Sequence, residues 1–299
     1  MSFSQGAQTV NQSPIFVYVK TATAKVSIKP AGQSDWNAIQ KFGRLFSGDS
    51  LKMPEKATVL LGDGSSPWKE LTGPKVISIA ARKIRSSRIG RFFERLYRTF
   101  FIESQRRPFS REATRNLGSL LLAVPDTVLA YSMPDSLRWI KNGVWWMQYQ
   151  VHITRNRQTV WDTVVEGNSL KLSRKAGRWQ QPGHYKIRVI MPQGGSSLPE
   201  VDSTVIRLQD DRLNTPVLLQ YRQLKNRVEN TDRREDYFAL LDFCLHEKLY
   251  LEAEHYLVQM VAKFPDNPEP QIMLYAYYSS FLPEDIAERL VIDRRKELR

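Results

Sequence analysis

The chain is poor in cysteine, histidine and long apolar runs, and these shortages exclude several classes of structure. One cysteine, Cys244, allows no intramolecular disulfide framework and no cysteine-rich zinc site. A secreted protein can also lack disulfides, so this count does not define the compartment. The longest apolar stretch, LLLAV at 120–124, is far too short to cross a membrane, which takes about 20 residues.

The N-terminus lacks the features of a secretory signal. It reads MSFSQGAQTVNQSP, without a basic start and without an apolar run of about 7–15 residues. As written, the chain is therefore expected to be soluble and cytoplasmic, or periplasmic if the start codon is mis-assigned.

Catalytic and metal-binding motifs are also missing. The sequence contains no Walker-type phosphate loop, no dinucleotide fingerprint and no nucleophile elbow. The acidic pairs Asp210-Asp211 and Glu284-Asp285 fit a loop and a helix start, where carboxylates complement the helix dipole. His246 and His255 lie on different predicted helices, and we expect Cys244 to pack in the core. We therefore expect no enzyme activity, no metal and no cofactor.

What the sequence does contain is material for packed cores and an uneven charge. Apolar residues make up 41% of the 299 residues, and this length predicts two or three domains. The net charge is +13. Residues 81–115 hold eleven Lys and Arg against three Asp and Glu, whereas residues 231–299 hold nine against fourteen. The basic excess is thus a localised feature.

The strongest pattern lies near the C-terminus, between Tyr237 and Pro265. Its sequence, YFALLDFCLHEKLYLEAEHYLVQMVAKFP, resembles one tetratricopeptide (TPR) repeat, and a shift of about 34 residues reveals part of a second. Such helical hairpins stack into a curved surface that binds another protein. The matching residues are Leu240, Ala253, Leu257 and Pro265, then Leu274, Tyr278 and Ala287.

Helices are predicted near 216–228, 234–247, 249–263, 269–281 and 283–297. Because fewer than two repeats are visible, we expect packing on the preceding domain or on a partner to complete the core. Tyr275, Tyr277 and Tyr278 are neighbours, and we expect that they cannot all face inward. The candidate protein-binding residues are therefore Tyr250, Tyr275 and Tyr277.

Residues 15–80 predict a small β-domain. Short apolar runs alternate with turn residues, and Gly62-Asp63-Gly64 predicts a hairpin turn before Trp68. The stretch FGRLFSGDSLKM at 42–53 resembles the FecR-like domain, which carries a glycine, an apolar residue, a Gly-Asp pair and a leucine at this spacing. The matching residues are Gly43, Phe46, Gly48, Asp49 and Leu51.

Residues 81–116 predict a basic amphipathic helix and a polar linker. Its apolar residues follow helical spacing, with arginines on the other side. Four interpretations stay open: packing on the β-domains with a solvated basic face, docking on an acidic protein surface, binding of nucleic acid, and binding of an anionic membrane. The basic patch consists of Arg85, Arg88, Arg91, Arg95, Arg98, Arg106 and Arg107.

Residues 117–212 predict a β-sandwich, because alternating strands recur with turn signals every 8–12 residues. The layout resembles an Ig-like or fibronectin-like domain. Trp139 ends one strand, Tyr149 begins the next, and Pro182-Gly183 opens the last.

The predicted fold class is a multidomain β plus α protein. It has a disordered N-terminus (1–14), a FecR-like β-domain (15–80), the basic helix and linker (81–116), an Ig-like sandwich (117–212) and a TPR-like array (213–299). This order resembles the arrangement of cyanobacterial-type FecR-domain proteins. Nothing in this resemblance implies an enzyme. From the TPR-like pattern and the missing catalytic motifs we expect a non-catalytic adaptor or scaffold that binds an acidic protein or a peptide segment. The alternative is nucleic-acid or anionic-membrane binding through residues 82–115.

Overall fold

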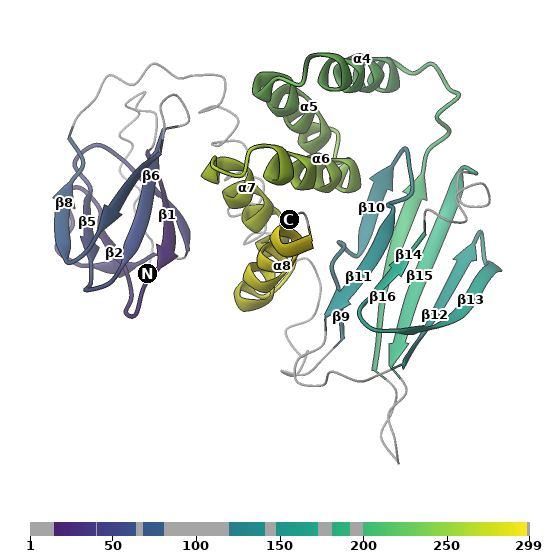
Figure 1. The fold of residues 1–299 in the computed structure, drawn as a ribbon, viewed down its shortest axis with the longest axis horizontal. Coiled ribbons are helices and arrows are strands. Elements are labelled where there is room, and N and C mark those ends of the chain that lie inside the picture. Colours follow the sequence, from purple (N-terminus) through teal and green to yellow (C-terminus); the bar gives the residue numbers. More distant parts are fainter. Residues whose placement is uncertain are drawn as a thin grey trace, which may run out of the picture. The chain divides into compact units, whose positions relative to one another are not determined.

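The computed structural model describes residues 15–39, 41–63, 68–80, 120–140, 148–172, 181–191 and 200–297. The chain divides into two compact units, Met1–Arg95 and Leu96–Arg299. The described part of the first unit is built of strands, and that of the second combines β-sheets with five C-terminal helices (Figure 1). The predicted combination of β and α structure is therefore confirmed. No helix in the described ranges is long and apolar enough to span a membrane.

The first unit contains two four-stranded sheets, in the orders β4-β1-β6-β7 and β3-β2-β5-β8. Apolar residues of both sheets, among them Val17, Leu51 and Val59, form one buried cluster. Alternate side chains of each strand can therefore reach this common core. The strands are β1 Ile15–Thr21, β2 Ser27–Lys29, β3 Asn37–Ala38, β4 Phe42–Leu45, β5 Ser50–Met53, β6 Thr58–Gly62, β7 Lys69–Thr72 and β8 Lys75–Ser78.

The Gly48-Asp49 pair has a structural role in this unit. The buried Asp49 carboxylate accepts hydrogen bonds from the backbone amides of Ala31 at 2.9 Å and Phe46 at 2.7 Å. Gly48 has a φ of +88°, and a Cβ added there would lie 3.0 Å from the Ala31 Cβ. Glycine is therefore favoured at this position both by the backbone conformation and by the close neighbour.

The second unit begins with a five-stranded sheet, β10-β16-β15-β12-β13, and a three-stranded sheet, β14-β11-β9. Strands β10 and β16 pair in parallel, and the other paired strands in the described part of both sheets are antiparallel. Strand β15 opens at Gly183 as predicted, and β16 follows it and contains the run STVIRL at 203–208. The strands are β9 Leu121–Leu122, β10 Thr127–Ala130, β11 Ser136–Ile140, β12 Gln148–Arg155, β13 Gln158–Glu166, β14 Ser169–Lys171, β15 Gly183–Met191 and β16 Glu200–Leu208.

These two sheets enclose one hydrophobic core. Trp139 of the three-stranded sheet is fully buried, and its ring meets that of Tyr149 edge-on at 5.4 Å. Buried Asp202 on β16 accepts a 2.6 Å hydrogen bond from the Leu122 amide on β9. The Thr204 hydroxyl donates to the Pro125 carbonyl at 2.6 Å. Apolar packing and the buried Asp202 hydrogen bond thus join the sheets, and Thr204 holds the connection between β9 and β10.

Five helices follow, close to their predicted positions. Thr215 caps α4 by accepting a hydrogen bond from the Leu218 amide, and Asn267 caps α7 by accepting one from the Glu269 amide. Each helix packs on the next, and α6 also contacts α8. The helices are α4 Pro216–Thr231, α5 Arg234–His246, α6 Tyr250–Lys263, α7 Pro268–Ser279 and α8 Glu284–Glu297.

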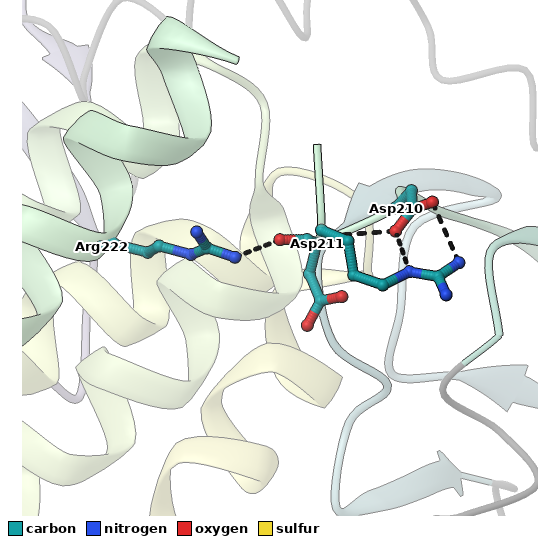
Figure 2. Close-up of polar contacts among 4 residues, drawn as sticks. Asp210, Asp211 and Arg222 are labelled. Atoms are coloured by element: carbon teal, nitrogen blue, oxygen red, sulfur yellow. Dashed lines mark hydrogen bonds and ion pairs between the residues drawn. The ribbon is translucent and has the colours of Figure 1, made fainter. Parts of the chain in front are cut away.

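A short connection with internal ion pairing leads from β16 to α4. The Arg212 guanidinium donates to both carboxylate oxygens of Asp210, at 3.0 and 3.2 Å. These hydrogen bonds lower the pKa of Asp210. Figure 2 shows Arg222 reaching from α4 to the backbone carbonyl of Asp211. The acidic pair thus lies in a loop, and Glu284-Asp285 opens α8, as predicted.

Candidate interaction site in the helical array

The structure buries two of the three tyrosines that were predicted to bind a partner. Tyr275 is 2% exposed and Tyr277 is fully buried, as is Tyr278. The expectation that these three neighbours cannot all face inward is therefore wrong. All residues from Ile272 to Tyr278 are buried, so α7 has no solvent-facing side over this stretch.

The physical reason is visible in the composition of α7. A helix that is apolar on every side is typical of a position surrounded by other elements. The Tyr277 ring meets those of Tyr278 and Phe281 edge-on at 5.3 and 5.2 Å. The Tyr275 hydroxyl donates to Glu284 on α8 at 2.8 Å. The absence of a polar stripe between 272 and 278 is the sequence signal that indicates full burial.

Tyr250, the third candidate, is half-buried and packs against the core of the β-sandwich. Leu251, its neighbour at the start of α6, belongs to that core. The first turn of α6 therefore faces the sheets, and Figure 1 shows α6 beside β10. This contact agrees with the expectation that packing on the sandwich completes the core of the array.

A buried carboxylate lies at this junction. Glu252, on the first turn of α6, is 3% exposed and accepts hydrogen bonds from the amides of Tyr131 at 2.6 Å and Ser132 at 3.3 Å. Burial raises the pKa of Glu252 to about 7, although these amides act in the opposite direction. Among the described residues its Oε2 atom has no hydrogen-bond partner. The sequence contains no signal for this contact, because the partners are about 120 residues apart.

Aromatic residues surround the same junction. The rings of Tyr131 and Tyr221 stack with centroids 5.6 Å apart, which joins the loop after β10 to α4. Tyr221 also shares a side-chain hydrogen bond with Tyr256 on α6. Burial raises the pKa of Tyr256 to about 12 and raises that of the buried Cys244 thiol. The expectation that Cys244 lies in the core is confirmed.

Two further buried carboxylates connect helices to one another. Glu254 on α6 accepts from the Arg294 guanidinium of α8 at 2.7 Å and from the Tyr278 hydroxyl of α7 at 2.6 Å. Burial alone would lower the pKa of Arg294, but Glu254 and Tyr278 together outweigh it and the pKa is raised. Glu269 on α7 is 2% exposed and pairs with Arg234 of α5 at 3.3 Å. These three acids make α5 to α8 and the sandwich one connected body.

The remaining predicted residues are not brought into a common site. His246 and His255 are exposed, whereas Cys244 is buried between helices. Over the described ranges, no group of three or more His, Cys, Asp and Glu is arranged to hold a metal ion. The basic patch of residues 85–107 lies outside the described residues.

Exposed apolar side chains of the array lie elsewhere than predicted. Leu219 on α4 is 44% exposed, Leu213 just before it is 57% exposed, and Ile292 on α8 is 45% exposed. Leu219 and Ile292 belong to the first and last helices and Leu213 to the loop before α4; none of them lies on α7. Comparison with known proteins gives no relative: no family model and no curated protein matches the chain.

Proposed function

We propose that the chain is a non-catalytic adaptor or scaffold, in which a TPR-like helical array and an Ig-like sandwich present binding surfaces beside a FecR-like β-domain. The observation that carries this proposal is the preorganised array. Its helices are joined by buried ion pairs and tied to the sandwich by Glu252, so an exposed surface is held in place before a partner arrives.

The TPR-like assignment is supported by the burial of the signature positions. Six of the seven matching residues are buried in the array, and α6 ends at Lys263, two residues before Pro265. The buried positions are Leu240, Ala253, Leu257, Leu274, Tyr278 and Ala287. Helix pairs α5–α6 and α7–α8 then correspond to the two hairpins expected from the sequence.

The Ig-like assignment is supported by two packed sheets with an edge-on Trp139–Tyr149 pair between them. The FecR-like assignment is supported by Gly48 and Asp49, whose conformation and hydrogen bonds explain the need for this pair. In this proposal Tyr275 and Tyr277 stabilise the array. The partner contacts exposed apolar residues of the outer helices, beginning with Leu213 and Leu219.

The proposal is tested by affinity purification of the full chain from its native cells. Leu213→Glu combined with Leu219→Glu would be compared with Val76→Glu, a control at a 63% exposed valine of the first unit. A protein that co-purifies with the wild type and the control but not with the double variant supports the adaptor function. Equal recovery with all three chains contradicts this surface.

The alternative function is binding of nucleic acid or an anionic membrane through residues 82–115. Salt and nuclease treatment distinguish it from the adaptor function. Counterion release makes nucleic-acid binding fall steeply between about 0.1 and 0.5 M salt, whereas apolar anchors tolerate salt better. Material that is lost with salt or nuclease, and that co-purifies equally with the wild type and the double variant, would favour binding through the arginine-rich segment.

A further inference from the structure

Among the residues that the structure describes, the outer face of the five-stranded sheet carries exposed charges of opposite sign on its two sides. Side chains alternate along each strand, so residues adjacent to core residues point outward. On β15 and β16 the exposed cations are Lys186, Arg188 and Arg207. On β13, at the far edge, the exposed anions are Asp162 and Glu166.

The cations are available for a partner. In the part of the chain that the structure describes, none of Lys186, Arg188 and Arg207 forms a hydrogen bond or ion pair through its side chain. Among the described residues, the two anions pair with weakly basic or neutral side chains: His152 lies 2.8 Å from Asp162, and Gln148 donates to Glu166 at 3.1 Å. Strand β12 lies between the cations of β15 and the anions of β13, and it carries no acidic residue. Within one copy the cations and the anions are therefore held apart.

A row in which three of the four side chains are apolar crosses the same face. The strand register aligns Val201 with Ile190, Ile190 with Gln150, and Gln150 with Val164. Val201 is 40% exposed and Val164 is 57% exposed. The next row consists of Ser203, Arg188, His152 and Asp162, also aligned by the register. A mostly apolar row beside a row with a cation at one side and an anion at the other is the pattern of a protein-binding face.

From this pattern we infer that the outer face of the sheet binds a second copy of the chain, with a two-fold axis parallel to the strands. Rotation about such an axis reverses the strand order and keeps each row opposite itself. The row of Val201, Ile190, Gln150 and Val164 then meets its own reverse, which places Val201 opposite Val164 of the second copy. Arg188 comes to lie beside Asp162 of the second copy, and the reverse contact forms by symmetry.

A two-fold axis perpendicular to the strands would place β13 opposite β13 of the second copy. It would bring Asp162 and Glu166 close to the same acidic residues of that copy. Repulsion between like charges disfavours this arrangement. A uniformly acidic partner would meet Asp162 and Glu166 on β13, and nucleic acid would make no use of the apolar row. The second copy is therefore the occupant that brings the cation and the anion of one row, Arg188 and Asp162, beside each other.

The size of the face is sufficient for a specific dimer. Four strands of eight or nine residues at about 3.3 Å per residue and about 4.8 Å spacing cover roughly 550 Å² per copy. With β10 added, the two copies together bury about 1,200 Å², at the lower limit of stable interfaces. Burial of this size with few apolar anchors predicts a dimer that is sensitive to salt.

The test uses sedimentation velocity on the full chain at about 0.05 M and about 0.5 M salt, which bracket strong and weak screening. One variant makes the face acidic, by Lys186→Glu, Arg188→Glu and Arg207→Glu. A second makes it basic, by Asp162→Lys and Glu166→Lys. We expect a wild-type dimer that weakens with salt, a monomer for each variant, and a heterodimer when the two variants are mixed.

A matched control carries the same change of charge away from the face, by Lys171→Glu, Arg227→Glu and Lys248→Glu, at three exposed positions. It should dimerise like the wild type. Circular dichroism establishes that each variant is folded. A monomeric wild type at all accessible concentrations, a dimer unaffected by the face variants, or loss of the dimer in the control would each overturn the inference.

Disulfide cross-linking tests the proposed arrangement of the rows without changing any charged residue. A Val164→Cys chain mixed with a Val201→Cys chain should form a disulfide between the two chains under mild oxidation. Neither chain should cross-link efficiently to its own copy, because the rows meet in reverse. Cross-linking that is as efficient within each variant as between them would contradict the proposed axis.

Discussion

The Glu252 carboxylate on α6 accepts a 2.6 Å hydrogen bond from the backbone amide of Tyr131, which lies in the loop after β10. This contact crosses from the helical array to the β-sandwich, and the Glu252 side chain itself is buried. A buried carboxylate stabilises such a junction only to the extent that hydrogen bonds replace its hydration. Its consequences are measurable as a dependence of stability on pH.

The first prediction concerns that dependence. The pKa of Glu252 is raised to about 7 in the fold, so the folded chain binds its proton more tightly than the unfolded chain. The stabilisation is present below about pH 4.5 and is lost as the pH rises through about 7. Relative to Glu252→Gln, which cannot ionise, the wild type should lose roughly 2–3 kcal/mol of unfolding free energy between pH 5 and pH 8.

Urea unfolding followed by circular dichroism at both pH values measures this difference. Glu229→Gln, at an exposed position of α4, serves as the control and should leave the pH dependence unchanged. An identical pH dependence in the wild type and Glu252→Gln would show that the junction does not perturb this carboxyl group.

The second prediction compares two arginines of α8. Arg294→Ala leaves the buried Glu254 carboxylate without its cation and should cost about 3–5 kcal/mol of stability. Arg289→Ala removes an exposed pair with Asp285 at 3.0 Å and should cost less than about 1 kcal/mol. Thermal unfolding of the two variants measures the two losses of stability. Equal losses would contradict a buried role for Arg294.

The third prediction compares two glycines of the first unit. Gly48→Ala imposes a positive φ on alanine and a close contact with Ala31, whereas Gly32→Ala imposes a positive φ of +77° in open space. Alanine in the left-handed region costs about 1–2 kcal/mol, so Gly32→Ala should lose about that and Gly48→Ala more. Tryptophan fluorescence during urea unfolding measures both. A smaller loss at Gly48 would show that the Ala31 contact relaxes freely.

The fourth prediction concerns Tyr277. Because this side chain is fully buried, Tyr277→Ala should cost about 3–5 kcal/mol, the range for truncation of a large aromatic residue in a core. Leu219→Ala, at an exposed position of α4, should change stability by no more than about 0.5 kcal/mol. Thermal unfolding followed at the helical signal measures both changes. Normal stability of Tyr277→Ala would restore this residue as a candidate for direct partner contact.

Much of the secondary structure follows from local patterns. Alternation predicts β12 and β15, and Pro216, Asn267 and Pro268 stand at helix starts whose capping is local chemistry. The TPR-like spacing predicts buried positions such as Leu240 and Ala253, because helical periodicity defines a face within a few residues. These features depend on neighbours along the chain, which the sequence states directly.

The tertiary structure alone decided what each face meets. The sequence defines α7 as rich in tyrosine, but only packing between other elements places Tyr275 and Tyr277 in the core. Glu252 and Tyr131 are distant in sequence, so their contact arises from the folding of α6 onto the sandwich. The alignment of Arg188 with His152 and Asp162 likewise depends on strand register, which is set by non-local pairing of strands and not by any local pattern.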